Sequence, residues 1–256
     1  MKYFFYDTWF QFEKYMRITL RMPLWTLFGL VQPLIWLLIF GELFRNMVQL
    51  GNFPNASYLE FLTPGILVMT VLFGSSWSGV SLLREINFGT VNKVLVTPVK
   101  RTSIVLSRVI HSAVTVLIQI VIIFVLAEML GARAKGGVAG IVVVFIQILF
   151  LAVGFASLSN GFAMKLKREE PLVVIGNMMT LPLMFFSSAF IPQFLMPDWI
   201  RSLSVLNPVS YAVDGVRLGL NGEFTTPFQF SLFMVVSFAL GTLGWATSVF
   251  LEQQND

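Results

Sequence analysis

The residues best suited to a specific interaction lie in one short basic segment, REINFGTVNKVLVTPVKR, at residues 84–101. Its Gly89-Thr90 pair predicts a turn and a helix N-cap, because a threonine side chain accepts hydrogen bonds from the amides of a first helical turn. Pro98 ends the predicted helix, since proline biases the preceding residue away from helical geometry. Three apolar residues share one face of this helix at spacings of three and four: Val91, Val94 and Leu95.

The chemistry that this segment offers is recognition rather than catalysis. A helix of about two turns is unstable in water on its own, so its apolar face needs a surface to pack against. The residues themselves leave three such surfaces open: the membrane, the chain's own helices and a separate partner protein.

The sequence lacks the residue patterns of common hydrolases and nucleotide-binding enzymes. It contains no HExxH or GxSxG motif and no GxxxxGK[ST] phosphate loop. It has no cysteine and a single histidine, His111, which excludes thiolate chemistry and makes a histidine-based zinc site implausible. We therefore expect no catalytic residue, no metal site and no cofactor on this chain.

The elements that must position this segment lie in a membrane. Of the 256 residues, 56% are hydrophobic and only 12% are charged, which is about half the charge of a typical soluble domain. A membrane-spanning helix needs about 20 apolar residues. The predicted fold is an all-α polytopic membrane protein, a single domain over residues 1–256 with six transmembrane helices. The predicted spans are residues 24–44, 61–83, 104–130, 138–164, 171–191 and 228–251.

Two other segments are too polar to span. Residues 1–23 predict an N-terminal amphipathic helix that lies in the headgroup plane, with a basic face and a face that carries Phe5 and Trp9. Residues 192–220 are broken by prolines and predict a re-entrant hairpin of two short helices on the outer side.

Charges and small residues add three expectations. Most of the 17 Lys and Arg residues lie on the side of the two termini, which predicts cytoplasmic termini by the positive-inside rule. Arg108, near the inner end of the third span, is expected to reach the interface by snorkelling. Gly154, Ser157 and Gly161 recur at spacings of three and four, which favours close helix packing.

Two separated stretches resemble one family. The segment REINFGTVNKVLVTPVKR resembles the loop between the second and third spans of ABC type-2 exporter permeases, which include daunorubicin-exporter-like and nodulation-type subunits. The stretch LNPVSYAVDGVR, residues 206–217, resembles the segment before the last span of the same permeases. With the six-span layout, this similarity covers essentially the whole chain. Asn87 departs from the charged residue that many relatives have at this position.

The resemblance implies a transport subunit and not an enzyme. In that family, the first segment holds a cytoplasmic coupling helix that docks on a separate ATP-binding subunit, which carries the ATP and the Mg ion. The residues that this coupling role implies here are Arg84, Glu85, Gly89, Thr90, Val91, Val94, Leu95 and Pro98. The second segment implies a gate in the outer hairpin, formed by Asn207, Pro208, Tyr211, Asp214 and Arg217. The spacing of three residues between Asp214 and Arg217 predicts that they pair on one helical face.

The resemblance also implies a homodimer in a prokaryotic cytoplasmic (inner) membrane. Its cargo would be an amphiphilic or hydrophobic small molecule, drug-like or lipid-like, and no nucleic acid would take part. A permease for a lipid-linked glycan or polysaccharide is the alternative within the family. An ion-coupled carrier or channel is disfavoured by the scarcity of charge inside the predicted spans, and a membrane-bound enzyme by the absence of catalytic motifs.

Overall fold

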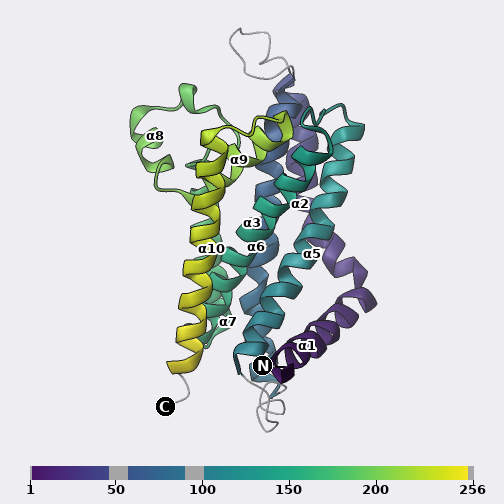
Figure 1. The fold of residues 1–256 in the computed structure, drawn as a ribbon, viewed down its shortest axis with the longest axis vertical. Coiled ribbons are helices and arrows are strands. Elements are labelled where there is room, and N and C mark those ends of the chain that lie inside the picture. The colour runs from purple at the N-terminus through teal and green to yellow at the C-terminus, as the bar shows by residue number, and fades with distance from the viewer. Residues whose placement is uncertain (1, 46–56, 90–100, 253–256) are drawn as a thin grey trace.

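The computed structural model describes residues 2–45, 57–89 and 101–252, and over these ranges the chain is helical and contains no β-strand. Most helices of the bundle run along the long axis of the molecule (Figure 1). The bundle helices are α2 (Pro23–Leu43), α3 (Tyr58–Asn87), α5 (Arg101–Met129), α6 (Gly137–Leu166), α7 (Glu169–Phe185) and α10 (Thr226–Glu252). The prediction of an all-α polytopic membrane protein is confirmed.

Four helices in the described part of the chain are long and apolar enough to cross a membrane. They are Tyr58–Asn87, Thr102–Met129, Gly137–Leu166 and Thr226–Glu252, and a shorter apolar helix covers Leu27–Leu43. Each of the six predicted spans overlaps a helix. That α2 and α7 also cross the membrane stays a prediction.

Helix α7 ends at Phe185, before the expected end of the fifth span at residue 191. The last carbonyl groups of α7 find partners outside the helix, because Asn207 Nδ2 donates to the carbonyl oxygens of Leu183 at 2.6 Å and Phe186 at 3.2 Å. These bonds satisfy acceptors that a helix end leaves open. The chain then turns over residues 186–190.

Helix α3 forms the centre of the bundle. Every residue from 61 to 72 is buried, as expected of a helix that is apolar all round and surrounded by others. It contacts α2, α5, α6, α7 and α9.

Helix α1 (Lys2–Arg21) lies obliquely against the lower part of α5, at the end of the bundle that also holds the last turn of α10 (Figure 1). We call this the basal end, and we call the opposite end, with α8 and α9, the distal end. Phe5, Trp9 and Phe10 of α1 are 69%, 62% and 63% exposed. An amphipathic helix with this exposed aromatic surface suits the membrane interface.

The small residues of α6 face α10. A Cβ on Gly154 would lie 2.6 Å from the Phe238 ring, and a Cβ on Gly161 would lie even closer to the Trp245 ring. Ser157 is fully buried. Only residues without a bulky side chain let these two helices approach so closely.

The segment between α7 and α10 carries three short elements at the distal end (Figure 1). They are η2 (Gln193–Leu195), α8 (Asp198–Ser204) and α9 (Pro208–Asn221). Gly222, with φ 79°, ends α9 in the left-handed region that favours glycine. These elements occupy the region expected to form the broken hairpin.

Candidate functional site

The predicted coupling segment begins at the basal end of α3, and the structure describes three of its predicted residues. Arg84 and Glu85 lie in the last turn of α3. Gly89 has φ 69°, a conformation that glycine adopts at little cost, as the predicted turn requires. The other predicted coupling residues lie outside the described residues: Thr90, Val91, Val94, Leu95 and Pro98.

Glu85 is the centre of an ion-pair cluster that joins three helices. Its Oε2 lies 2.6 Å from Arg108 Nη2 of α5 and 3.9 Å from Lys14 Nζ of α1. Tyr15 OH, also of α1, donates to the same oxygen at 3.4 Å. We call Glu85, Arg108, Lys14 and Tyr15 the basal cluster.

Arg108 is buried, and the expectation that it snorkels to the interface is wrong. Its side chain is 4% exposed, and its guanidinium carbon lies 4.7 Å from the centre of the Tyr15 ring. Helix α1 covers the position from which Arg108 would otherwise reach the surface. Burial raises the pKa of the Tyr15 hydroxyl to about 12, so this hydroxyl keeps its proton at neutral pH.

Further contacts extend the junction at the basal end. Thr19 Oγ1 of α1 and His111 Nε2 of α5 are hydrogen-bonded at 2.7 Å. Arg84 Nε pairs with Glu169 Oε2 at the start of α7, at 3.1 Å. The two charged residues expected to contact an ATPase are thus also paired within the chain, to α1, α5 and α7. A movement at the end of α3 would therefore reach three other helices.

Phe88 is a candidate that the sequence reading missed. It follows the last turn of α3 and is 81% exposed. Because Phe88 directly precedes the predicted coupling helix, this apolar side chain can add to the contact surface of that segment. Its place beside the Gly89 turn was visible in the sequence, but its exposure was not.

Asp214 of α9 is the centre of a second cluster, at the distal end. Its carboxylate accepts a hydrogen bond from Ser188 Oγ at 2.5 Å and one from Gln193 Nε2 at 2.9 Å. It also pairs with Arg217 Nη1 at 3.2 Å, as the spacing of three residues predicted. We call Asp214, Arg217, Ser188 and Gln193 the distal cluster. It ties α9 to the segment that follows α7.

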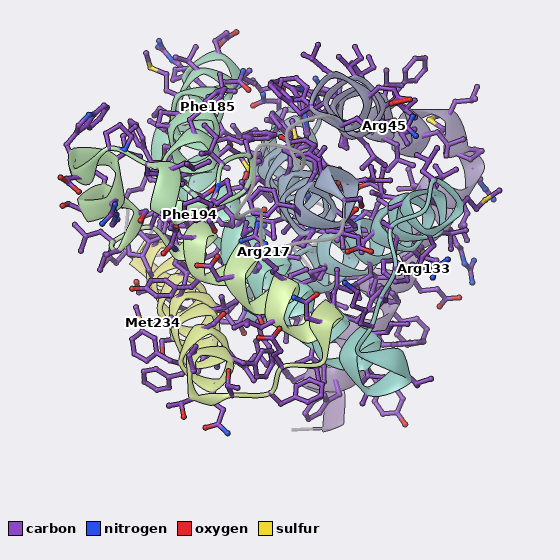
Figure 2. All side chains as sticks on the ribbon, turned by 90° about the horizontal axis from the view of Figure 1, so that it is seen from above. Arg45, Arg133, Phe185, Phe194, Arg217 and Met234 are labelled. Atoms are coloured by element: carbon purple, nitrogen blue, oxygen red, sulfur yellow. The ribbon has the colours of Figure 1, made fainter. Side chains whose placement is uncertain are left out.

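Arg217 holds α9 against the top of α3. Its side chain is 15% exposed, and Figure 2 shows it near the middle of the distal end. Its Nη2 donates to the Ser188 carbonyl oxygen at 2.8 Å, and its guanidinium carbon lies 4.1 Å from the centre of the Phe61 ring. Burial lowers the pKa of Arg217 to about 10 while Asp214 opposes this shift, so the guanidinium stays charged at neutral pH.

The other predicted gate residues shape the bend before α9. Asn207 caps the helix by accepting from Val209 N at 2.9 Å, and Pro208 occupies the first turn. Tyr211 OH donates to the Val205 carbonyl oxygen at 2.7 Å. The predicted gate residues therefore form one connected distal unit, and whether this unit moves during transport stays a prediction.

Replacing Asp214 with alanine is expected to lower the free energy of unfolding by about 2–3 kcal/mol and to reduce transport. The change leaves a largely buried guanidinium without its counter-charge. Unfolding of the purified protein in detergent, followed by circular dichroism, measures the first effect.

Asp198→Ala is the matched control for Asp214→Ala. Asp198 pairs with Arg201 at the same spacing, but its side chain is 97% exposed. We expect a loss below about 1 kcal/mol there. Equal effects of the two substitutions, or normal transport by Asp214→Ala at wild-type abundance, would contradict a role for the distal cluster.

The fold and its two clusters define a polytopic membrane protein whose charged side chains connect helices. Within the described ranges, no group of three or more His, Cys, Asp or Glu side chains could hold a metal ion. The sequence model of the ABC-2 type transporter family matches residues 6–221, which reach from α1 to the end of α9. The chain belongs to the ABC-2 type transporter family.

Named permeases are similar over most of the chain. The transport permease ycf38 of Cyanophora paradoxa is 33% identical over 241 residues, which cover 93% of this chain and 82% of that protein. The daunorubicin resistance ABC transporter permease protein DrrB1 of Streptomyces coeruleorubidus is 28% identical, over 75% of this chain and 67% of its own. The inner membrane transport permease YadH of Escherichia coli K12 is 26% identical, over 82% and 84%.

Proposed function

We propose that this chain is the membrane permease of an ATP-driven exporter that moves an amphiphilic or hydrophobic small molecule out of the cytoplasm or the inner leaflet. The similarity to a daunorubicin resistance permease carries this proposal. The apolar character of the spans supports it, because charged groups that would handle ions inside a membrane are costly and rare in this sequence.

The ATP-binding subunit is a separate chain in this proposal, and it carries the ATP and the Mg ion. It docks at the basal end, on the coupling segment that begins with Arg84 and Glu85. The exposed Phe88 and the left-handed turn at Gly89 support a contact surface at this point. The ion pairs of Arg84 with α7 and of Glu85 with α1 and α5 connect that surface to these three helices.

A second copy of the chain completes the transport pathway, with a seam formed by α2 and α7. Both helices carry apolar side chains that a single chain leaves exposed. Those of α2 include Val31, Ile35 and Leu38, and those of α7 include Val174, Met178 and Leu181.

The complex lies in a prokaryotic cytoplasmic membrane, with the basal end and both termini in the cytoplasm. Since the chain has no native cysteine, Asp256→Cys and Arg133→Cys can be labelled separately in sealed cells. A membrane-impermeant thiol reagent should react from outside only with position 133, which is exposed beside the distal end (Figure 2). The reverse pattern would overturn this orientation.

Reconstitution tests the proposed function as a whole. The chain is co-expressed with ATP-binding subunits from the same genome, purified and placed in lipid vesicles. ATP hydrolysis stimulated by amphiphiles, together with their ATP-dependent movement across the membrane, is the expected result. Movement of the same molecules by the chain alone, driven by an ion gradient, would favour a carrier instead.

A further inference from the structure

A groove lies between α6 and α7, with α3 behind it. The lining is mostly apolar and contains no charged residue. Its apolar residues are Phe155, Leu158 and Phe162 of α6 and Leu172, Ile175 and Met179 of α7.

Gly176 is one of the residues of α7 that line the groove. It lies in the interior of α7, and a Cβ built on it would meet nothing within 4 Å. Glycine inside a helix is unfavourable by about 1 kcal/mol relative to alanine, and at Gly176 no close neighbour requires it. Its effect is to leave space along the wall of the groove.

Two of the three hydroxyl groups in the lining, those of Ser76 and Ser159, are hydrogen-bonded to the protein itself, and the third belongs to Thr180, which is buried. Ser159 Oγ donates to the Ser76 carbonyl oxygen at 2.6 Å and accepts from Gly79 N at 2.9 Å. Ser76 Oγ donates to the Leu72 carbonyl oxygen at 2.7 Å. The groove therefore offers apolar contact, and it suits a hydrocarbon chain.

Basic side chains gather at the basal mouth of the groove. Lys167 and Arg168 form the link from α6 to α7, within about two helical turns of the lining residues Phe162 and Leu172. Lys165 lies in the last turn of α6, where its Nζ lies 5.6 Å from the centre of the Trp245 ring of α10. All three basic residues are exposed.

The nearby acidic charges do not cancel this basic group. Glu169 is paired with Arg84, which leaves the exposed Glu170 as its remaining acidic neighbour in the first turn of α7. The mouth is therefore net positive, next to a groove without charge.

We propose that this groove and its mouth form a binding site for an anionic phospholipid of the cytoplasmic leaflet. Part of one acyl chain lies in the groove beside Gly176, and the phosphate lies against Lys167 and Arg168. Charge complementarity at the mouth selects an anionic headgroup over a zwitterionic one, because basic residues at a membrane surface attract anionic lipids. The lipid is a resident ligand of the permease, separate from the exported cargo.

The site would support α7, a helix of 17 residues that contacts α3 and α6. The acyl chain of a bound lipid would add apolar contacts to α7 beside Gly176, which has no side chain to make them. It also links the α6–α7 connection to the Arg84–Glu169 pair and so to the base of the coupling segment.

Native mass spectrometry of the purified chain in mixed micelles tests the proposal. The probes are phosphatidylglycerol and phosphatidylcholine with identical acyl chains. The wild type is expected to retain phosphatidylglycerol about tenfold more strongly. Gly176→Phe, which fills the groove, should reduce retention of phosphatidylglycerol to the level of nonspecific lipid. Gly176→Ala is the matched control and should retain it as the wild type does.

A second variant tests the headgroup site without changing the groove. Lys167→Asn with Arg168→Gln is expected to remove the preference for phosphatidylglycerol, and asparagine suits the left-handed backbone at Lys167, where φ is 53°. Arg133→Gln at the distal end removes an exposed charge elsewhere and should change nothing.

Equal retention of the two lipids by the wild type, or undiminished retention by a folded Gly176→Phe variant, would overturn the proposal. If Gly176→Phe does not fold, the headgroup variant decides alone: a lost preference supports the site, and a retained preference refutes it. These results do not depend on an ATPase or on transport, so failure of the proposed export function would leave them unchanged.

Discussion

Replacing Leu95 with aspartate is expected to weaken association with the ATP-binding subunit at least about a hundredfold and to abolish stimulated ATP hydrolysis. In the proposed complex, the apolar face of Val91, Val94 and Leu95 sits in a groove of that subunit, as anchor residues do. An aspartate there would be buried without a partner, which costs far more than the loss of a charge at the rim. Pull-down of the ATP-binding subunit from detergent, at matched expression, measures the effect.

Two further variants distinguish the apolar anchor residues of the coupling segment from the charged residues around them. Leu95→Met conserves volume and apolar character and should bind almost normally. Lys93 faces away from the apolar side of the predicted helix and is expected at the polar rim of the contact. Lys93→Gln removes this charge and should mainly reduce the salt dependence of association. Normal association and transport by Leu95→Asp would mean that the coupling segment is only a surface helix.

Replacing Glu85 with leucine is expected to lower the free energy of unfolding by about 3–5 kcal/mol, because it leaves Arg108 buried and without its counter-charge. Arg108 cannot turn to solvent, since its side chain is 4% exposed beneath α1. Chemical unfolding in detergent, followed by circular dichroism, measures this loss.

Replacing Arg108, the partner of Glu85, should lower the free energy of unfolding much less. Arg108→Met removes the buried charge, while Glu85, 20% exposed, keeps Lys14 at 3.9 Å and contact with water. We expect a loss of about 1 kcal/mol, and the double variant Glu85→Leu with Arg108→Met should recover most of the stability, as replaced buried ion pairs often do.

An exposed pair provides the control for this asymmetry. Glu42 pairs with Arg45 at 3.4 Å, with side chains 71% and 76% exposed. Glu42→Leu should cost less than about 1 kcal/mol. Additive effects of the Glu85 and Arg108 substitutions would show that the two residues act independently and would contradict the basal cluster.

The candidate site could be predicted only in part. The sequence indicated Arg84, Glu85 and the Gly89 turn as one segment, and it paired Asp214 with Arg217 from their spacing. It did not indicate that Ser188 and Gln193 complete the distal cluster, or that α1 closes over Arg108. These partners are distant in sequence, as with Tyr15 and Glu85, which are 70 residues apart.

The sequence by itself determined the membrane class, the positions of the helices and the family. Whether a stretch enters a bilayer depends on its summed hydrophobicity, a local property that needs no knowledge of neighbours. Helix boundaries set by proline also depend only on the local sequence, as at Pro23, where α2 begins. The family followed from two short motifs whose residues are contiguous in the chain.

Only the tertiary structure decided how the charges near the helix ends are used. A snorkelling arginine and a buried one have the same local sequence, and the difference at Arg108 is the presence of α1 above it and of Glu85 beside it. The end of α7 was decided in the same way, because the side chain that satisfies its last carbonyl groups comes from Asn207 of the hairpin. Helix neighbours set these pairings, and helix neighbours are a property of the assembled bundle.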